Sequence, residues 1–176
     1  GNIMDGNGRW AQAQGLTRLD GHRAGSESLR RVLRAAVRFG VPIITIYVFS
    51  TENWGRPTAE VQGIMSLAEY MIENELDELD EEGVQLRHLG RMDRLPPGLQ
   101  REFQHAIERT KHNQRLILNA AFNYGGRTEI VDAIQGIVAD GVPAEQIDEA
   151  TVSRYLYTSG LPDPDLIIRT SGEMRV

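Results

Sequence analysis

The residues best suited to chemistry lie near the start of the chain, where the sequence reads Asp5-Gly6-Asn7-Gly8-Arg9-Trp10. The carboxylate of Asp5 is a hard oxygen ligand, of the kind that Mg²⁺ takes when it also binds substrate phosphates. The glycines lack a Cβ, so the backbone can approach a ligand and its N–H groups can form an anion-binding nest. Arg9 adds a planar fork of donors that suits phosphate. The segment therefore fits a phosphate- and metal-binding loop, and it fits a tight turn equally well, because Asp, Gly and Asn favour turns.

Apolar segments predict the strands that position such loops. Residues 41–49 and 116–122 are almost continuously apolar, as expected for strands buried on both faces of a parallel sheet. Residues 84–89 are predicted to form a shorter strand. Residues 1–4 resemble the stub of another strand, and 166–168 a fifth. Polar loops follow four of these five strands, beginning at Asp5, Ser50, Asn123 and Arg169.

Helical patterns occupy the segments between the strands. Apolar residues at helical spacing predict helices over 24–39 and 58–82, and each is followed by a glycine. Further helices are expected around 99–107, after residue 127 and near 150–157, whereas residues 5–22 are expected to be loop. Charged residues on the helices are interpreted as solvated surface, namely the arginines at 30, 31, 34 and 38 and the acidic segment 73–82. Arg18, in the expected loop, is interpreted in the same way. Strands that alternate with helices predict an α/β fold with a single layer of mainly parallel sheet flanked by helices.

The predicted topology brings the polar loops together. In an open parallel sheet, ligands bind outside the carboxyl ends of the strands, so the loops should share one rim. That rim would carry Asp5 and four arginines, at positions 9, 56, 127 and 169. Such a site suits two polyphosphate groups and a metal ion better than a neutral substrate.

Composition narrows the class of protein. The chain has 176 residues, enough for one domain with a core, and we expect a single domain over 1–176. Its net charge of −6 argues against general nucleic-acid binding. The absence of cysteine excludes disulfides and thiolate catalysis. No apolar segment reaches the length of a membrane span.

Taken together, the motifs resemble the cis-prenyltransferase family, which includes undecaprenyl diphosphate synthase. The resemblance extends along the whole chain and rests on six segments in order, at 4–10, 21–25, 49–54, 56–57, 123–127 and 168–173. It implies that the chain condenses isopentenyl diphosphate onto an allylic diphosphate such as farnesyl diphosphate. Each cycle would add a five-carbon unit with a cis double bond and release diphosphate. The product would be a polyprenyl diphosphate such as the undecaprenyl carrier lipid of cell-wall synthesis.

The resemblance also implies roles for single residues. Asp5 matches an essential carboxylate that handles Mg²⁺ and the leaving diphosphate, and Asn53 matches a proposed proton acceptor. Gly6, Asn7, Gly8 and Arg9 match the cradle of the allylic diphosphate. Further positions implied to bind substrate are Trp10, Arg18, His22, Ser50, Thr51, Glu52, Trp54 and Arg56. Arg169 and Arg175 match the site for isopentenyl diphosphate. On this resemblance, Arg18 belongs to the site rather than to the solvated surface.

The same resemblance sets further expectations. We expect a homodimer that is cytoplasmic, can associate peripherally with the membrane surface and releases its lipid product to the membrane. The family pattern continues beyond Val176 and begins before Gly1, so the sequence is expected to be truncated at both ends, mostly at the C-terminal end. The alternative is a non-catalytic partner subunit of a cis-prenyltransferase complex, although such subunits lose the carboxylate and diphosphate loop that this chain keeps.

Strand geometry predicts where a growing prenyl chain would end. Val41, Val84 and Leu116 open their strands, and Leu116 should lie about 20 Å below the rim at ~3.3 Å per residue. These side chains are expected to form an apolar floor that limits elongation.

Overall fold

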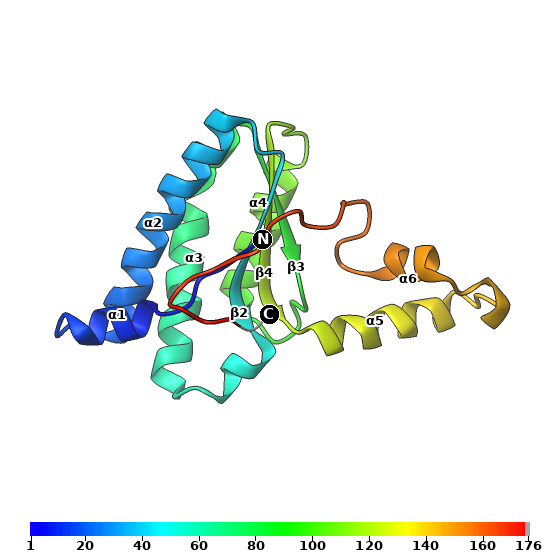
Figure 1. Ribbon diagram of the computed structural model, residues 1–176, viewed down its shortest axis with the longest axis horizontal. Helices are drawn as coiled ribbons and strands as arrows, with labels where there is room; N and C mark the ends of the chain where they lie inside the picture. The colour runs from blue at the N-terminus through cyan, green and yellow to red at the C-terminus, as the bar shows by residue number, and fades with distance from the viewer. Residues whose placement is uncertain (175–176) are drawn as a thin grey trace.

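The computed structural model describes residues 1–174, which form one five-stranded sheet flanked by helices (Figure 1). The strands are β1 (Asn2–Ile3), β2 (Ile43–Ser50), β3 (Val84–Leu89), β4 (Leu116–Tyr124) and β5 (Ile168–Arg169). They lie in the order β3-β4-β2-β1-β5, and every neighbouring pair is parallel. The expected α/β fold with a parallel sheet is therefore confirmed.

Helices connect the strands and cover the sheet. They are α1 (Asn7–Ala13), α2 (Arg18–Phe39), α3 (Thr58–Glu81), α4 (Pro97–Thr110), α5 (Gly126–Ala139) and α6 (Glu149–Tyr155). Two 3₁₀ turns, η1 (Thr51–Gly55) and η2 (Ala144–Gln146), complete the described elements. None of the helices within residues 1–174 combines the length and apolar character needed to cross a membrane.

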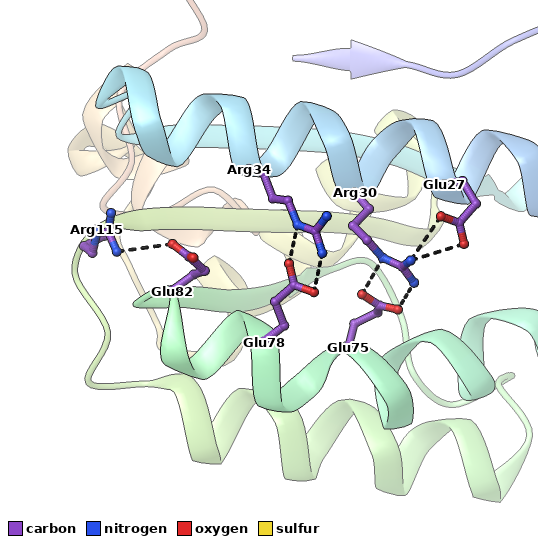
Figure 2. A network of polar contacts seen from close by, with 7 residues as sticks. All are labelled: Glu27, Arg30, Arg34, Glu75, Glu78, Glu82 and Arg115. Atoms are coloured by element: carbon purple, nitrogen blue, oxygen red, sulfur yellow. Dashed lines mark hydrogen bonds and ion pairs between the residues drawn. The ribbon is translucent and has the colours of Figure 1, made fainter.

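The core lies between the sheet and a layer formed by α2, α3 and α4. Because side chains alternate across a strand, β4 directs Leu116, Leu118, Ala120 and Phe122 into this core. Figure 2 shows α3 between α2 and α4, and apolar residues of all three helices belong to the same buried cluster. This layer supplies one wall of the space in which a ligand could lie.

Two short strands bring the ends of the described chain together. Residue Asn2 pairs with Ile46 on one side and with Ile168 on the other, and Ile3 pairs with Tyr47 and Arg169. The carboxyl ends of β1, β2 and β5 therefore meet at one edge of the sheet, as the sequence predicted.

Helices α5 and α6 extend away from the rest of the molecule (Figure 1). Of the apolar face predicted on α5, Ile137 is buried whereas Ile130, Ile134 and Val138 are about half exposed or more. The expected periodicity is present, but within the described chain this helix packs chiefly against α6.

The expectation of a loop over 5–22 was wrong. Gly6 has a left-handed φ of 94° and precedes α1, and Thr17 and Asp20 form a capping box that starts α2 six residues earlier than expected. Asp20 satisfies the backbone N–H of Thr17, while the Thr17 hydroxyl accepts from the Asp20 N–H. The two helices cross closely at Gly21, where an added Cβ would collide with the carbonyl oxygen of Asn7.

We predict that Gly21→Ala destabilises the protein by about 1–3 kcal/mol, because overpacking forces α1 away from α2. Gly126→Ala is the matched control, since a Cβ there would meet nothing within 4 Å. Urea unfolding of both variants measures the difference. Equal free energies of unfolding for the two variants would show that the α1–α2 crossing tolerates a methyl group.

Candidate active site

A cavity of about 780 Å³ begins at the carboxyl edge of the sheet and runs inward between α2, α3 and the strands. We call it the main cavity. Its outer end is lined by Asp5, His22, Asn53, Arg56 and Arg169. Its inner part is lined by apolar side chains, including Leu33, Ile72, Val84, Leu118 and Phe122. A polar mouth thus leads into an apolar interior, which suits an amphiphilic molecule with a charged head and an apolar tail.

Asp5 and Arg169 form an ion pair at the mouth. Nε and Nη2 of Arg169 both lie 2.7 Å from Oδ2 of Asp5. The side chains are 34% and 18% exposed, so the pair is partly shielded from water but open to the cavity. The Thr170 hydroxyl also donates to the backbone oxygen of Asp5 at 2.6 Å. The strand pairing of β1 with β5 is therefore reinforced where the two charged side chains meet.

The segment 6–10 turns tightly beside the same mouth. A side chain at Gly6 would collide with Ser171, and one at Gly8 would crowd the guanidinium of Arg18. Asn7 lines the main cavity, while Arg9 is 60% exposed and forms an ion pair with Glu173 at 3.0 Å. Trp10 is half exposed. Neighbouring side chains lie so close to the backbone at Gly6 and Gly8 that a side chain at either position would be crowded.

Glu60 lies against two arginines and a histidine of the site. Its Oε1 accepts from Arg18 Nε at 3.2 Å and from Arg56 Nη1 at 3.1 Å, and it lies 3.7 Å from His22 Nε2. The Glu60 side chain is only 12% exposed. Sequence reasoning missed this residue, although its position four residues after Arg56 at the start of a helix was a usable signal.

His22 is held largely neutral at pH 7. Burial lowers the pKa of its imidazole and the charge of Arg56 lowers it further, while Glu60 acts in the opposite direction. Its Nε2 is buried and makes no hydrogen bond within the described chain. A polar atom of this kind beside the cavity is suited to a ligand that supplies the missing partner.

The turn η1 carries the next set of predicted residues. The amide oxygen of Asn53 accepts from the backbone N–H of Ser50 at 3.1 Å, which fixes the side chain beside the cavity. Ser50 and Glu52 also line the cavity, whereas Thr51 lies against Gly125 at the start of α5. Because an amide oxygen has two lone pairs, Asn53 retains acceptor capacity in this arrangement.

Trp54 anchors η1 to the sheet rather than lining the cavity. Its Nε1 donates to Oδ1 of Asn123 at 2.8 Å, its ring packs edge-on against Phe49, and Arg94 lies 4.8 Å over it. Asn123 has a left-handed φ of 53° and donates from its amide to the backbone oxygen of Arg91. Asn123 was identified in the sequence only as the start of a polar loop, and its contact with Trp54 was not foreseen.

The donor set for a metal ion consists mainly of Asp5. Within residues 1–174, no three His, Cys, Asp or Glu side chains gather closely enough to hold a metal. Mg²⁺, however, commonly binds through one or two carboxylates and completes its shell with water and substrate phosphates. The Nε and Nη2 contacts from Arg169 both use Oδ2 of Asp5, and the Asp5 side chain is one third exposed. The residues present therefore fit a magnesium ion that arrives with a phosphorylated substrate.

The structure thus brings together much of the predicted site. The predicted residues that line the main cavity are Asp5, Asn7, His22, Ser50, Glu52, Asn53, Arg56 and Arg169. Those that lie beside it are Gly6, Gly8, Arg9, Trp10, Arg18, Thr51 and Trp54. Arg127 lies in the first turn of α5, and it is absent from the described lining of the cavity although the sequence placed it on the rim. Arg175 lies outside the described residues.

Two expectations about the interior need correction. Arg30 and Arg34 are not a purely solvated face, because both form ion pairs with glutamates of the acidic end of α3 and line the cavity. Of the three residues expected at the floor, Val84 lines the cavity, whereas Leu116 is fully buried in the core beyond it. Val41 precedes β2 and is 38% exposed. The cavity therefore reaches the predicted depth at Val84, but its lining does not include Leu116 or Val41.

Comparison with known proteins places this geometry in a family. Residues 3–176 match the family model described as "Putative undecaprenyl diphosphate synthase". The chain is 51% identical over 178 residues to the isoprenyl transferase of Heliobacterium mobile, covering 99% of this chain and 68% of that protein. It is 48% identical over 174 residues to the isoprenyl transferase of Fusobacterium nucleatum, covering 99% and 74% respectively.

Solved structures agree with the sequence matches. A lavandulyl diphosphate synthase from Lavandula x intermedia, in complex with dimethylallyl diphosphate, superposes with a TM-score of 0.92 at 32% identity, covering 99% of this chain and 77% of that one. A probable undecaprenyl diphosphate synthase from Campylobacter jejuni gives 0.81 at 26% identity, with 99% and 75% covered. The sequence, the parallel fold and the cavity agree with these relatives, and the chain belongs to the undecaprenyl diphosphate synthase family of cis-prenyltransferases.

Proposed function

We propose that the protein condenses isopentenyl diphosphate onto an allylic diphosphate, such as farnesyl diphosphate, with cis double bonds. Repeated cycles give a polyprenyl diphosphate, and the undecaprenyl carrier lipid for cell-wall synthesis is the product we favour. The observation that carries this proposal is the continuity of the main cavity from a charged mouth to an apolar interior. Diphosphates suit the mouth, and a lengthening hydrocarbon suits the interior.

The allylic diphosphate is assigned to the α1 side of the mouth. The backbone and side chains of residues 6–9 cradle its phosphates, and Arg18, His22 and Arg56 add donors that Glu60 holds in place. Trp10 and residues 50–52 with Trp54 complete this part of the site. Fixed cations that face developing negative charge on a leaving diphosphate lower the barrier to its departure, because they need little rearrangement.

The isopentenyl diphosphate is assigned to Arg169 and Arg175. Arg169 ends β5 beside Asp5, so the two substrates would meet close to that carboxylate. Asn53 lies across the mouth on η1 and is proposed to accept a proton from the isopentenyl unit after the new carbon–carbon bond forms. An amide is a weak base, and positioning near the departing diphosphate would assist it.

Asp5 is proposed to hold Mg²⁺ together with phosphate oxygens of the substrate. When bound, the ion would neutralise charge on the departing diphosphate. The Asp5–Arg169 ion pair would then rearrange, which frees the arginine's fork for the second diphosphate.

Further parts of the proposal concern assembly and location. We propose a homodimer, and the exposed apolar residues of α5 and of the segment 166–168 support a protein–protein interface there. We also propose a cytoplasmic enzyme that associates peripherally with the membrane surface and releases its lipid product to the membrane. We also propose that residues 1–176 belong to a single cis-prenyltransferase domain.

A non-catalytic partner subunit is the alternative function. Asp5, the glycine turn and the cation cluster around Glu60 all argue against it, since a subunit without catalysis has no need of them. Incubation with Mg²⁺, farnesyl diphosphate and labelled isopentenyl diphosphate separates the two functions. Labelled lipid product supports the enzyme, and its absence from well-folded protein supports the partner subunit.

Replacing Asp5 tests the metal-binding carboxylate. Asp5→Asn keeps the shape of the side chain but removes its charge, so we expect loss of most turnover with the fold retained. Glu145→Gln, at an exposed acid on η2, is the control for loss of one negative charge. Turnover at several Mg²⁺ concentrations and circular dichroism measure the two effects. Near-normal Mg²⁺-dependent turnover in Asp5→Asn would refute the role.

Replacing Arg169 tests the second diphosphate site. Lysine keeps the charge but not the bidentate fork, so Arg169→Lys should raise KM for isopentenyl diphosphate about tenfold, equivalent to roughly 1.4 kcal/mol. KM for the allylic substrate should change little. Arg127→Lys is the control, since Arg127 follows strand β4 of the same sheet but does not line the described cavity. Equal weakening of both substrates would contradict the assignment.

The titration of His22 tests whether the side chains around Glu60 bind a diphosphate. We expect its pKa in the free protein to lie below the ordinary value of 6.5, because burial and Arg56 both disfavour the imidazolium. Glu60→Gln should lower the pKa further, and inorganic diphosphate should raise it, since added negative charge favours the protonated ring. NMR titration of the imidazole signals measures these shifts.

His88 provides the internal reference for that titration. Burial also lowers its pKa, but it hydrogen-bonds to the backbone oxygen of Phe122 inside the core. Its titration should not respond to diphosphate. A His22 pKa that is equally insensitive would show that the anion binds elsewhere.

A further inference from the structure

Ion pairs join α2 to α3 along one side of the main cavity (Figure 2). Arg30 donates to both carboxylate oxygens of Glu75, and Arg34 donates to both oxygens of Glu78 at 2.5 and 2.9 Å. We call these four residues the clasp. The arginines are spaced four residues apart on α2 and the glutamates three apart on α3, so the pairs lie on successive turns of both helices.

The clasp forms part of the wall of the main cavity. All four of its residues line that cavity, next to apolar side chains that include Leu33 of α2 and Leu79 of α3. A second cavity of about 570 Å³ lies on the other side and is lined by Leu19, Tyr70 and other residues of α2 and α3. Arg30 and Glu75 line both cavities, together with Ser26, Leu67 and Met71. The Arg30–Glu75 pair is therefore the charged part of the partition between the interior of the protein and an outer hollow that contains apolar surface.

The charged part of this wall differs in kind from the sheet side of the cavity. Leu118, Ala120 and Phe122 of the sheet are buried in the core, and moving them would disrupt close packing. The clasp side chains are between 18% and 57% exposed, and ion pairs with such exposure add little net stability. Hydrogen bonding to Arg34 lowers the pKa of Glu78, so the pair stays charged at neutral pH. Separation of the pairs exposes charges to water, whereas separation of apolar walls exposes apolar surface.

We propose that the clasp is a side gate that sets how long a hydrocarbon tail the main cavity accepts. This inference rests on the proposed function, in which each cycle lengthens a tail inside a cavity of fixed volume. While the clasp is closed, the tail is confined to the main cavity. When the tail fills that space, it emerges between Arg30 and Glu75 into the second cavity, and the strength of the clasp decides how readily this happens. Arg30, Arg34, Glu75 and Glu78 are thus specificity-determining residues that do not touch the reacting atoms.

Cutting the clasp tests the gate. Glu75→Gln with Glu78→Gln removes both ion pairs while keeping side-chain size, and we expect the main product to lengthen by at least one five-carbon unit. The rate of the first condensation should not change, because the mouth of the cavity is untouched. Dephosphorylated products separated by chain length give the first quantity, and initial incorporation of labelled isopentenyl diphosphate gives the second.

Two further variants separate gating from general loosening. Arg34→Glu with Glu78→Arg exchanges the two charges of one ion pair, and the new side chains lie next to opposite charges, Arg30 on α2 and Glu75 on α3. Glu78→Gln alone should shift the distribution of product lengths. The charge exchange should restore the wild-type distribution. Arg109→Gln removes ion pairs to Asp77 and Asp80 that tie α3 to α4, away from both cavities. It should leave product length unchanged. A similar lengthening in Arg109→Gln, or an unchanged distribution in the folded and active clasp variant, would overturn the gate.

A binding measurement keeps the gate separate from the proposed function. n-Alkyl phosphates of increasing length should bind wild type more tightly with each added methylene until the cavity is full, and calorimetry locates that limit. In Glu75→Gln with Glu78→Gln the limit should move to longer chains. If the limiting alkyl length increases in the variant although the wild type forms no prenyl product, the gate stands and the proposed function fails. If product forms but neither the limit nor the product length moves, the gate fails and the proposed function stands.

Discussion

The parallel pairing of β1 between β2 and β5 is the constraint on which the site depends. Each of the strands β1 and β5 contributes only two residues, yet their register places Ile3 beside both Tyr47 and Arg169. Any residue that follows β1 must then lie beside the end of β5, so Asp5 and Arg169 meet although 164 positions separate them in the sequence. A slip of one residue would turn Arg169 to the other face of the sheet. The ion pair and the Thr170 hydrogen bond to Asp5 reinforce the register that creates them.

The site is arranged as a set of cations whose charges are balanced by nearby carboxylates. Asp5 forms an ion pair with Arg169, and Glu173 forms one with Arg9. Glu60 forms ion pairs with both Arg18 and Arg56. This balance allows several arginines to lie close together without strong mutual repulsion, and it holds their forks in place before a substrate arrives. The diphosphate of the proposed substrate carries more negative charge than one carboxylate, so under the proposed function it would compete for these donors. Glu60 is the least exposed of the carboxylates and is tied to two arginines at once. It is therefore suited to remain as the fixed support while the more open pairs rearrange.

Local pattern predicted most of the fold. The apolar strands, the helices over α2 and α3, and the glycines that end them follow from period and turn chemistry, and residues 84–89 form a strand with the predicted bounds. The start of α2 was also encoded locally, since Thr17 and Asp20 have the spacing of a capping box, but the four glycines around them favoured a loop. The common rim followed from topology alone. Glu60 and Asn123 did not, because their importance comes from partners on other elements, and no single segment reveals which charged residue of one helix will face another. Arg127 shows the opposite error, since it follows a strand at the rim but belongs to a helix that leads away from the cavity.

The cavity itself shows why depth along a strand is an incomplete guide to function. Leu116 and Val84 are paired in the sheet and lie at the same level, yet only Val84 lines the cavity. The helices decide this difference, because they determine how far the hollow extends over each strand. On the sheet side the cavity ends in close-packed core, which changes shape only at a large cost in packing. On the helix side it ends partly in hydrogen-bonded ions, which can exchange their partners for water. The capacity of the cavity is therefore a property of how α2 and α3 are held together as much as of the residues at its floor, and that property depends on charged side chains whose pattern along each helix separately suggested only solvated surface.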